Sequence, residues 1–593
     1  MAARADNEQT AEIIIEPEDT AWVSWRGIKA VADPGYALPL LCAIGGLLYL
    51  LNLGGYPIYT KGEAREAVTI FDICHGGGVI LPLRAGVEIP SKPLLMHWLA
   101  ALVSWGLGGV SELSVRLPSA LCAVGGMVVA YVYLRRLFDD AVGLVAAVAL
   151  GTSLQYLQAG TGARVDMTLM FFMEVAFFEI IMIAEGLSRR LLLLYLAMAL
   201  AVLTKGPIGV ALPLLVAGTW TAVYRRWELI GRLKPWWGAI VVGGIGGGWY
   251  AAAIAVGGMS FVRKQILDEN VYRLIGHAGV NVGHAHPFYY EDLALLAGFM
   301  PWTLLALPLA AAALLRRWRP DARAGYLLVW VVTVLVFYNL PQSKRGVYLL
   351  ALYPALSGLF ALGLCAVMAQ RKAASRLTAI ASRGLGAVLL LSGAAALGAL
   401  YVLREMPERA HVWFARCGID AVDLAPALVR EADRWRATAL LLPTIVIVSG
   451  AWLWWRRASI ARLWCGLVVG IACGGLAVHL VVEPAIARTL ALDGFARAAR
   501  GLAHGASIGY FGSLDYDFAY YSGRDLIRVS PRAGCEFIVS PEADWNRQPL
   551  TVTAQYTVLI LSNPTALDGT GRMLLLRRKS PALKLPGFYG LSI

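Results

Sequence analysis

The chain has 593 residues, of which 58% are hydrophobic and only 15% charged, and its formal net charge is +13. Typical soluble proteins carry about 25% charged residues, and the composition also excludes disordered, collagen-like and disulfide-rich chains. A polytopic α-helical membrane protein fits, because each crossing takes about 20 apolar residues.

The first 36 residues are polar and acidic, and they predict a cytoplasmic N-terminal tail rather than a cleavable signal peptide. Thirteen apolar runs follow and predict about 13 transmembrane helices in a domain over residues 37–485. The runs are 37–55, 114–134, 141–160, 166–186, 191–204, 207–224, 238–257, 293–315, 325–340, 346–369, 384–403, 437–455 and 463–482.

Basic residues indicate the orientation of these helices. Six clusters of Lys and Arg fall between alternate runs, from Arg135 and Arg136 to the cluster that ends at Arg462. The positive-inside rule places this side in the cytoplasm, so the charge predicts orientation and not nucleic-acid binding. The large outer loops are then 56–113, 258–292 and 404–436.

One further apolar stretch, residues 94–110, is long enough to be considered as a span. Counting it as a span would move Arg135 and Arg136 to the outer side. The charge pattern therefore predicts an interfacial helix there, with His97 and Trp98 near the lipid headgroups.

The last part of the chain, residues 486–593, is less apolar than the rest. Four short strand-like runs, SIGYFG, LIRVS, CEFIVS and YTVLILS, are separated by turn signals. They predict a small extracytoplasmic α/β domain.

Polar residues collect in four outer stretches: 59–66, 89–98, 162–168 and 340–348. Each also has a plain structural interpretation: solvated charges on an interfacial helix, a snorkelling Lys92, an Asp166 that caps a helix, and a solvated turn. Lys344 and Arg345 violate the positive-inside trend, and outer cations between spans suit an anionic ligand such as a phosphate.

Metal binding has little support in the sequence. His284 and His286 have an HxH spacing, but no acidic partner stands at a diagnostic distance along the chain. The eight cysteines form no CxxC pair. We therefore expect no cofactor, and a divalent metal stays an unsupported alternative.

The order of the outer motifs resembles bacterial lipid-linked glycosyltransferases of the GT-C fold, in the branch of aminoarabinose transferases and protein O-mannosyltransferases. The motifs that carry the resemblance are Glu63-Ala-Arg65, Ser91-Lys-Pro-Leu, Arg116-Leu-Pro-Ser, Asp166-Met, Leu203-Thr-Lys-Gly-Pro, Asn270-x-x-Arg273, His286-Pro, and Ser343-Lys344 with Tyr348. The similarity runs from about residue 37 to residue 370, with a looser match beyond.

The resemblance implies a sugar donor on undecaprenyl phosphate and a lipid A, glycan or protein acceptor, at the periplasmic face of the bacterial inner membrane. It implies Glu63 and Asp166 as catalytic carboxylates. For the donor phosphate it implies Arg65, Lys92, Lys205, Arg273, Lys344, Arg345 and Tyr348. The family's first motif usually supplies a catalytic Asp where this chain has Gly62, so Glu63 is the next candidate base. A hydroxyl acceptor needs a base, whereas a phosphate acceptor needs only positioning.

Two other functions stay open at this point. Many spans with outer polar residues also fit a transporter or flippase of lipid-linked sugars. Such transporters often have mid-membrane charges in broken helices, whereas the charges here lie mostly at the outer boundary. The glycine at position 62 also leaves open a non-catalytic subunit of envelope assembly.

Overall fold

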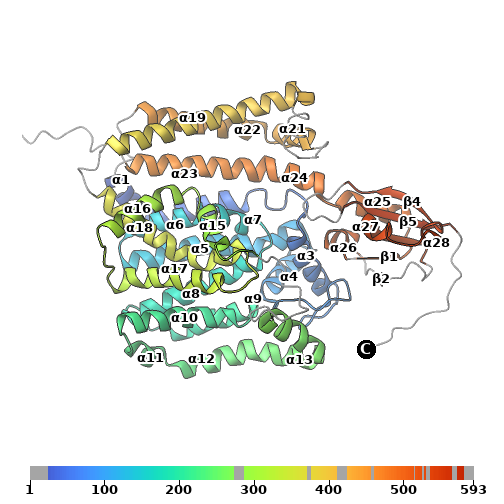
Figure 1. Cartoon of the computed structure of the whole chain (residues 1–593), viewed down its shortest axis with the longest axis horizontal. Coiled ribbons are helices and arrows are strands. Elements are labelled where there is room, and N and C mark those ends of the chain that lie inside the picture. The colour runs from blue at the N-terminus through green and yellow to red at the C-terminus, as the bar shows by residue number, and fades with distance from the viewer. Residues whose placement is uncertain are drawn as a thin grey trace, which may run out of the picture.

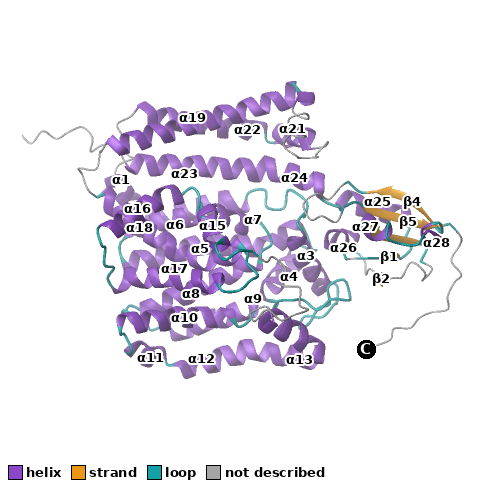
Figure 2. Ribbon diagram, in the orientation of Figure 1, coloured by secondary structure: helices purple, strands orange, loops and turns teal. Residues whose placement is uncertain are grey.

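The computed structural model describes residues 25–272, 286–369, 376–409, 424–455, 460–512, 514–523, 527–528, 535–563 and 571–579. Figure 1 shows long helices that lie side by side in stacked layers, with the strands grouped at one end of the helical body. Figure 2 shows that helices make up nearly all of that body. This agrees with the polytopic helical fold expected from the composition.

The first half of the chain is helical from α1 to α13. Its helices are α1 (Trp25–Val31), α2 (Pro34–Gly45), α3 (Lys61–Cys74), α4 (Leu95–Gly106), α5 (Glu112–Leu137), α6 (Asp140–Gly151), α7 (Leu154–Thr161), α8 (Val165–Ala184), α9 (Leu191–Lys205), α10 (Ile208–Tyr224), α11 (Glu228–Leu233), α12 (Pro235–Val242) and α13 (Gly248–Phe261). Three π-helical segments, Gly46–Leu50, Gly243–Gly247 and Val262–Tyr272, extend α2, α12 and α13.

The second half continues with helices up to residue 490. They are α15 (Tyr290–Gly298), α16 (Thr303–Leu315), α17 (Ala322–Asn339), α18 (Tyr353–Met368), α19 (Arg376–Glu405), α21 (Leu424–Arg434), α22 (Arg436–Trp455), α23 (Ile460–Ala477) and α24 (Glu483–Leu490). A 3₁₀ segment, Gly346–Leu352, precedes α18, and a π-helical segment, Val478–Val482, precedes α24.

Each of the thirteen apolar runs coincides with helix. Within the described residues, 8 helices are long and apolar enough to cross a membrane, or up to 10 if each bent pair is one span. The bent pairs are α6 with α7, at 64°, and α15 with α16, at 114°. The other three runs fall on the shorter helices Pro34–Leu50, α9 and α10. The expected count of about 13 crossings therefore stays a prediction.

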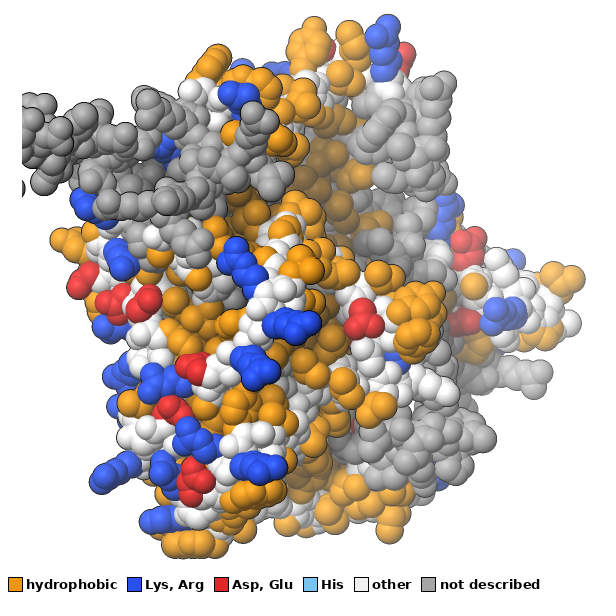
Figure 3. Space-filling view, turned by 60° about the vertical axis from the view of Figure 1, so that its left-hand side comes forward, with side chains coloured by type: hydrophobic (Ala, Val, Ile, Leu, Met, Phe, Trp, Pro, Cys, Tyr) orange, Lys and Arg blue, Asp and Glu red, His pale blue; other side chains and the backbone are white. Residues whose placement is uncertain are grey.

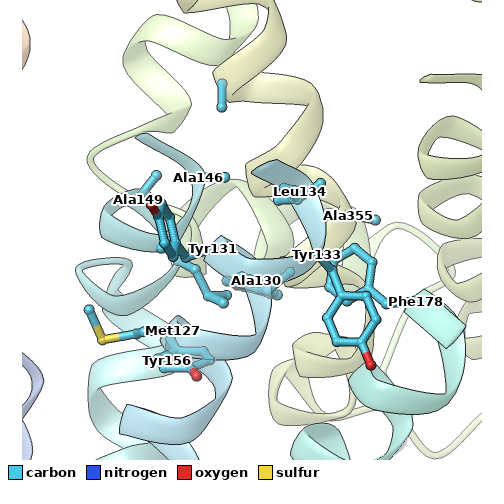
Figure 4. Packing of buried hydrophobic residues seen from close by; sticks show 14 of the residues in the cluster. Met127, Ala130, Tyr131, Tyr133, Leu134, Ala146, Ala149, Tyr156, Phe178 and Ala355 are labelled. Atoms are coloured by element: carbon cyan, nitrogen blue, oxygen red, sulfur yellow. The ribbon is translucent and has the colours of Figure 1, made fainter. Parts of the chain in front are cut away.

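Small side chains allow the inner helices to approach closely. Figure 4 shows Ala130, Ala146, Ala149 and Ala355 in one buried cluster with the rings of Tyr131, Tyr133 and Phe178. On α5, a Cβ at Gly126 would collide with the Tyr156 hydroxyl oxygen of α7, so only glycine fits there. Close packing of this kind is how helices associate where the surrounding lipid is as apolar as the helices themselves.

The basic clusters mark one end of the helical body. Figure 3 shows Lys and Arg side chains gathered on the end that comes forward in that view, where Figure 1 places α1 and α11. The C-terminal strands and helices α3 and α4 lie toward the opposite end. The predicted cytoplasmic and outer sides thus correspond to two ends of one body. α4 has 12 residues and is too short for an ordinary span, as the interfacial interpretation expects.

The C-terminal region forms a five-stranded mixed sheet in the order β2-β1-β3-β5-β4. Its elements are α25 (Asp493–Ala503), β1 (Ile508–Tyr510), α26 (Tyr516–Ser522), β2 (Ile527–Arg528), β3 (Phe537–Pro541), α27 (Glu542–Trp545), α28 (Leu550–Thr553), β4 (Tyr556–Leu561) and β5 (Met573–Arg578). β1 runs parallel to β2 and β3, and β5 runs antiparallel to β3 and β4. The four expected strands are present, and β5 was not anticipated.

This C-terminal region shares a core with the outer helix α3. Ala64 and Ala67 of α3 lie in the same buried cluster as Phe518 of α26 and Val539 of β3. Tyr521 accepts a hydrogen bond from the Ile58 backbone N–H at 2.7 Å and donates one to Glu112 at 2.9 Å. The sheet region is therefore attached directly to the helix that carries the first group of outer polar residues.

Candidate active site

Helix α3 brings two carboxylates to its buried face. The Thr60 side chain caps the first turn by accepting from the Glu63 N–H, and Glu63 and Glu66 lie one turn apart. Their relative exposures are 4% and 2%, which is unusual for glutamates unless they are paired. Each of the two has its own set of cationic partners.

Glu63 forms a buried ion pair with Arg116 of α5. The Arg116 Nε donates to Glu63 Oε1 at 2.7 Å, Nη2 donates to Oε2 at 3.2 Å, and the Ala163 N–H donates to Oε1 at 3.0 Å. Arg116 also donates to the carbonyls of Leu53 and Tyr56. The pair thus connects four parts of the chain. They are the end of the first apolar run, the first turn of α3, the first turns of α5 and the segment before α8.

This pairing affects the acidity of Glu63. Burial by itself raises the pKa of the Glu63 carboxyl, but the charge and hydrogen bonds of Arg116, the Ala163 N–H and the charge of Arg164 bring it below the usual value. A carboxylate with a lowered pKa and both oxygens engaged is a weak proton acceptor. The geometry therefore favours a structural role for Glu63 over the expected role of base.

Glu66 is the centre of a second cluster. Its Oε1 lies 3.0 Å from Arg65 Nη2 and 3.5 Å from Lys92 Nζ. Its Oε2 lies 2.7 Å from His97 Nε2 and 3.7 Å from Arg84 Nη2. One carboxylate thus faces three side chains that are cationic at neutral pH.

Burial and charge shift the acidities in the Glu66 cluster. Burial lowers the pKa of Lys92 to about 8, although the charges of Glu66 and Asp166 act in the opposite direction. Burial would raise the pKa of Glu66, but Lys92, Arg65 and the hydrogen bond of His97 lower it well below its usual value. Burial also lowers the pKa of His97, so its imidazole is neutral at pH 7. Lys92 is therefore mostly charged at pH 7 and loses its proton as the pH rises through about 8.

A third group of residues surrounds a small pocket at the outer ends of α8 and α9. Asp166 in the first turn of α8 forms an ion pair with Lys205 in the last turn of α9. The Lys205 Nζ lies 3.9 Å from the centre of the Tyr348 ring. Other residues that line the pocket are Leu169, Met170, Tyr338, Val347, Leu350 and Ala351. The pocket is thus charged at one side and mainly apolar elsewhere.

Lys92 lies between this pocket and the Glu66 cluster. The charges of Glu66 and Asp166 both favour its protonated form, and the charges of Arg65 and Lys205 both oppose it. Its side chain is 18% exposed. Lys92 directly precedes Pro93, which restricts the Lys92 backbone. Of the expected site residues, the structure thus brings together Arg65, Lys92, Asp166, Lys205 and Tyr348.

The remaining expected residues lie elsewhere or are not described. Lys344 is buried, and its ammonium donates to the carbonyls of Asn339 and Pro341 at the end of α17. The Arg345 N–H donates to Glu291 of α15 at 2.8 Å. Neither residue lines the pocket. Arg273 lies outside the described residues, as does His284 of the HxH pair.

Sequence reasoning missed several members of the site. Glu66 stands in the acidic stretch already noted, but one charge on an amphipathic helix is typical of a solvated face. The spacing of three between Glu63 and Glu66 was the available signal, because it places both on one face of a helix. Arg84 and Tyr338 gave no local signal, and His97 was assigned to the headgroup region. In the described part of the chain, no group of three or more His, Cys, Asp or Glu has the arrangement of a metal site.

Comparison with known families identifies related proteins. Residues 91–244 match the family model described as dolichyl-phosphate-mannose-protein mannosyltransferase. An undecaprenyl phosphate-α-4-amino-4-deoxy-L-arabinose arabinosyl transferase of Sodalis glossinidius is 30% identical over 331 residues, which are 54% of this chain and 58% of the relative. A transferase of the same name from Pseudomonas fluorescens is 27% identical over 427 residues, 68% of this chain and 70% of the relative. The chain thus spans little more than half the length of the first relative.

A solved structure has the same arrangement of helices. The crystal structure of ArnT from Cupriavidus metallidurans bound to undecaprenyl phosphate superposes with a TM-score of 0.69 at 19% identity. The match covers 93% of this chain and 100% of that chain. At this identity the superposition shows the fold, and it extends over the C-terminal part as well as the helical body.

Proposed function

We propose that this chain moves a sugar from a polyprenyl-phosphate donor to an acceptor at the outer face of the membrane. The reason is that the chain belongs to the family of GT-C lipid-linked glycosyltransferases. The observation that carries the proposal is the pocket at Asp166, Lys205 and Tyr348, with Lys92 beside it. Such a donor has an anionic head and an apolar chain. The cations at one side of the pocket match the anionic head, and the apolar chain suits the lipid in which the helices lie.

The cations have a chemical role in this reaction. An acceptor oxygen attacks the anomeric carbon of the sugar, the bond from that carbon to the phosphate oxygen breaks, and the lipid phosphate leaves with the electron pair. Where the acceptor is a hydroxyl, its proton passes to the leaving phosphate. The transition state has oxocarbenium character, and negative charge grows on the leaving phosphate. Lys92 and Lys205 lie where they stabilise that charge, and the Tyr348 hydroxyl is a further donor. Asp166 orients Lys205 toward this position.

The proposed lipid carrier and sugar follow from the named relatives. The relatives are arabinosyl transferases that use undecaprenyl phosphate, so we propose undecaprenyl phosphate as the carrier and an aminopentose as the sugar. The proposed location is the bacterial inner membrane, with the pocket and the C-terminal region facing the periplasm. The acceptor is lipid A, a glycan or a protein.

Transfer by the purified chain tests the proposal. The full-length protein in liposomes would be given undecaprenyl-phosphate aminoarabinose or an undecaprenyl-phosphate hexose, with extracted envelope lipids and glycans as acceptors. We expect mass spectrometry to detect a new sugar-bearing product and free undecaprenyl phosphate, with the aminopentose donor preferred. Movement of the intact donor across the bilayer without any product would instead indicate a flippase.

A further inference from the structure

The turn between α17 and the 3₁₀ segment Gly346–Leu352 brings two residues of the pocket together. Tyr338 stands in the last turn of α17 and Tyr348 in the 3₁₀ segment, and both line the pocket. The centres of their rings are 5.6 Å apart, and the Lys205 ammonium lies 3.9 Å from the Tyr348 ring. Residues 340–345 reverse the chain between the two tyrosines. The shape of this turn therefore decides where Tyr348 lies.

Lys344 closes the turn from within. Its side chain is buried, and its ammonium donates to the carbonyl of Asn339 at 2.9 Å and to the carbonyl of Pro341. The last carbonyls of a helix have no partner within the helix, and here the lysine supplies one at the end of α17. The charge of Lys344 is thus used inside the turn, and the residue does not line the pocket.

Glu291 of α15 holds the same turn from the neighbouring helix. Its side chain is buried, and its Oε1 accepts from the Arg345 N–H at 2.8 Å. Its Oε2 has no hydrogen-bond partner among the residues that the structure describes, but the charge of Lys344 acts on the carboxylate. A buried carboxylate at the border of a membrane is costly unless a cation lies near it. Glu291 and Lys344 therefore form one unit around the turn.

The Arg345 main chain connects this unit to Tyr348. Arg345 precedes the 3₁₀ segment, and its carbonyl accepts from the Tyr348 N–H at 2.9 Å. Gly346 lies directly against α15, since a Cβ at this position would be 3.1 Å from the Ala294 Cβ. The Glu291 bond thus fixes the start of the 3₁₀ segment, and the place of the Tyr348 ring follows from that start.

From this geometry we infer that Glu291 and Lys344 are positioning residues that hold Tyr348 at the donor phosphate. The inference rests on the proposed transfer reaction, in which Tyr348 and Lys205 bind that phosphate. Neither Glu291 nor Lys344 lines the pocket, so each acts through the turn and not by contact with the donor. Loss of either group should let Tyr348 move away from Lys205 and weaken donor binding.

Steady-state transfer by the full-length protein in liposomes, with undecaprenyl-phosphate aminoarabinose as the donor, tests this inference. Glu291→Met leaves the Arg345 N–H without its acceptor and should raise the KM for the donor by about 10-fold, with a smaller change in kcat. Glu291→Gln keeps an oxygen that can accept this bond and should recover most of the loss. Lys344→Met removes the ammonium and keeps an unbranched side chain. It is an independent variant, and we expect a similar rise in the donor KM.

Two further measurements separate positioning from a general loss of stability. In a Tyr348→Ala background, Glu291→Met should change the donor KM by less than about 2-fold, because the ring that it positions is gone. Glu179→Met is the matched control, since Glu179 is buried in α8 and accepts from the hydroxyls of Tyr133 and Ser188. We expect this control to lower the melting temperature and to leave the donor KM unchanged.

Other results would overturn the inference. A normal donor KM in both Glu291→Met and Lys344→Met would exclude the positioning role and leave the proposed transferase function intact. The same would follow if Glu291→Met raised the donor KM equally with and without Tyr348, or if Glu179→Met raised it as much as Glu291→Met does. Absence of transfer by the wild type to any acceptor would refute both the proposed function and this inference.

Discussion

Asp166 and Lys205 form an ion pair that joins the first turn of α8 to the last turn of α9, and the Lys205 ammonium faces the Tyr348 ring at 3.9 Å. The pair fixes a cation in the lining of the pocket. A cation that is already oriented does not have to be reorganised when charge develops on a leaving phosphate.

Removing the charge of Asp166 should therefore abolish transfer without unfolding the protein. We expect Asp166→Asn to lower kcat by about 10²-fold or more, because Lys205 loses the group that orients it. Activity and thermal melting of the purified variant check this. Asp139→Asn is a matched control, since Asp139 caps α6 by accepting from the Val142 N–H and Asn can do the same. Near-normal activity of Asp166→Asn would mean that Asp166 only stabilises the first turn of its helix.

Glu63 should matter more for stability than for proton transfer. Glu63→Gln leaves the buried Arg116 without a charged partner, which typically costs about 3–5 kcal/mol. We expect a clearly lower melting temperature in detergent. Glu228→Gln is the control, because the Arg226–Glu228 pair is exposed and such pairs contribute about 0–1 kcal/mol. A stable Glu63→Gln protein that has lost an acidic limb of its pH–rate profile would identify Glu63 as the base instead.

Lys92 should contribute to donor use more than Lys61 does. Lys92 lies between the Glu66 cluster and the pocket, whereas Lys61 is exposed at the start of α3. We expect Lys92→Ala to raise the KM for the polyprenyl-phosphate donor by about 10-fold or more, and Lys61→Ala to change it little. Donor titrations at fixed acceptor concentration measure both. Equal effects of the two substitutions would place Lys92 outside the phosphate site.

The pH dependence of donor use should report Lys92. Burial lowers its pKa to about 8, and only its protonated form attracts phosphate, so donor affinity should fall as the pH rises through about 8. The donor is a phosphodiester and keeps one negative charge over this range. We expect Lys92→Arg to flatten the profile, because a guanidinium stays charged. A donor KM that is constant from pH 7 to pH 9 in the wild type would contradict this.

Residues 94–110 should remain on one side of the membrane. Val79 precedes α4 and Gly109 follows it, both are exposed, and Gly109 has open space for a side chain. Cysteines introduced at these two positions should both react with an impermeant reagent added from the periplasmic side, above the background of the parent chain. Labelling of position 109 from the cytoplasm would reverse the orientation assigned to all later helices.

The sequence alone determined the class of protein and several members of the site. Hydropathy and charge are local properties, so they indicated the helical membrane body, the outer stretches and four of the strands. They also singled out Lys92 and Asp166, because each stands at the border of an apolar segment. Their order along the chain carried the family resemblance, from which Lys205 and Tyr348 were assigned to the donor site.

Only the tertiary structure decided which charges are paired. Glu63 and Arg116 are 53 residues apart, and their contact depends on how the ends of α3 and α5 converge. The same holds for Glu66, which has four partners. The role of a buried charge, as a base, a structural partner or a binding group, depends on its distances to groups on other helices. The sequence could not supply these distances, because hydrophobic periodicity along one helix contains no information about its neighbours.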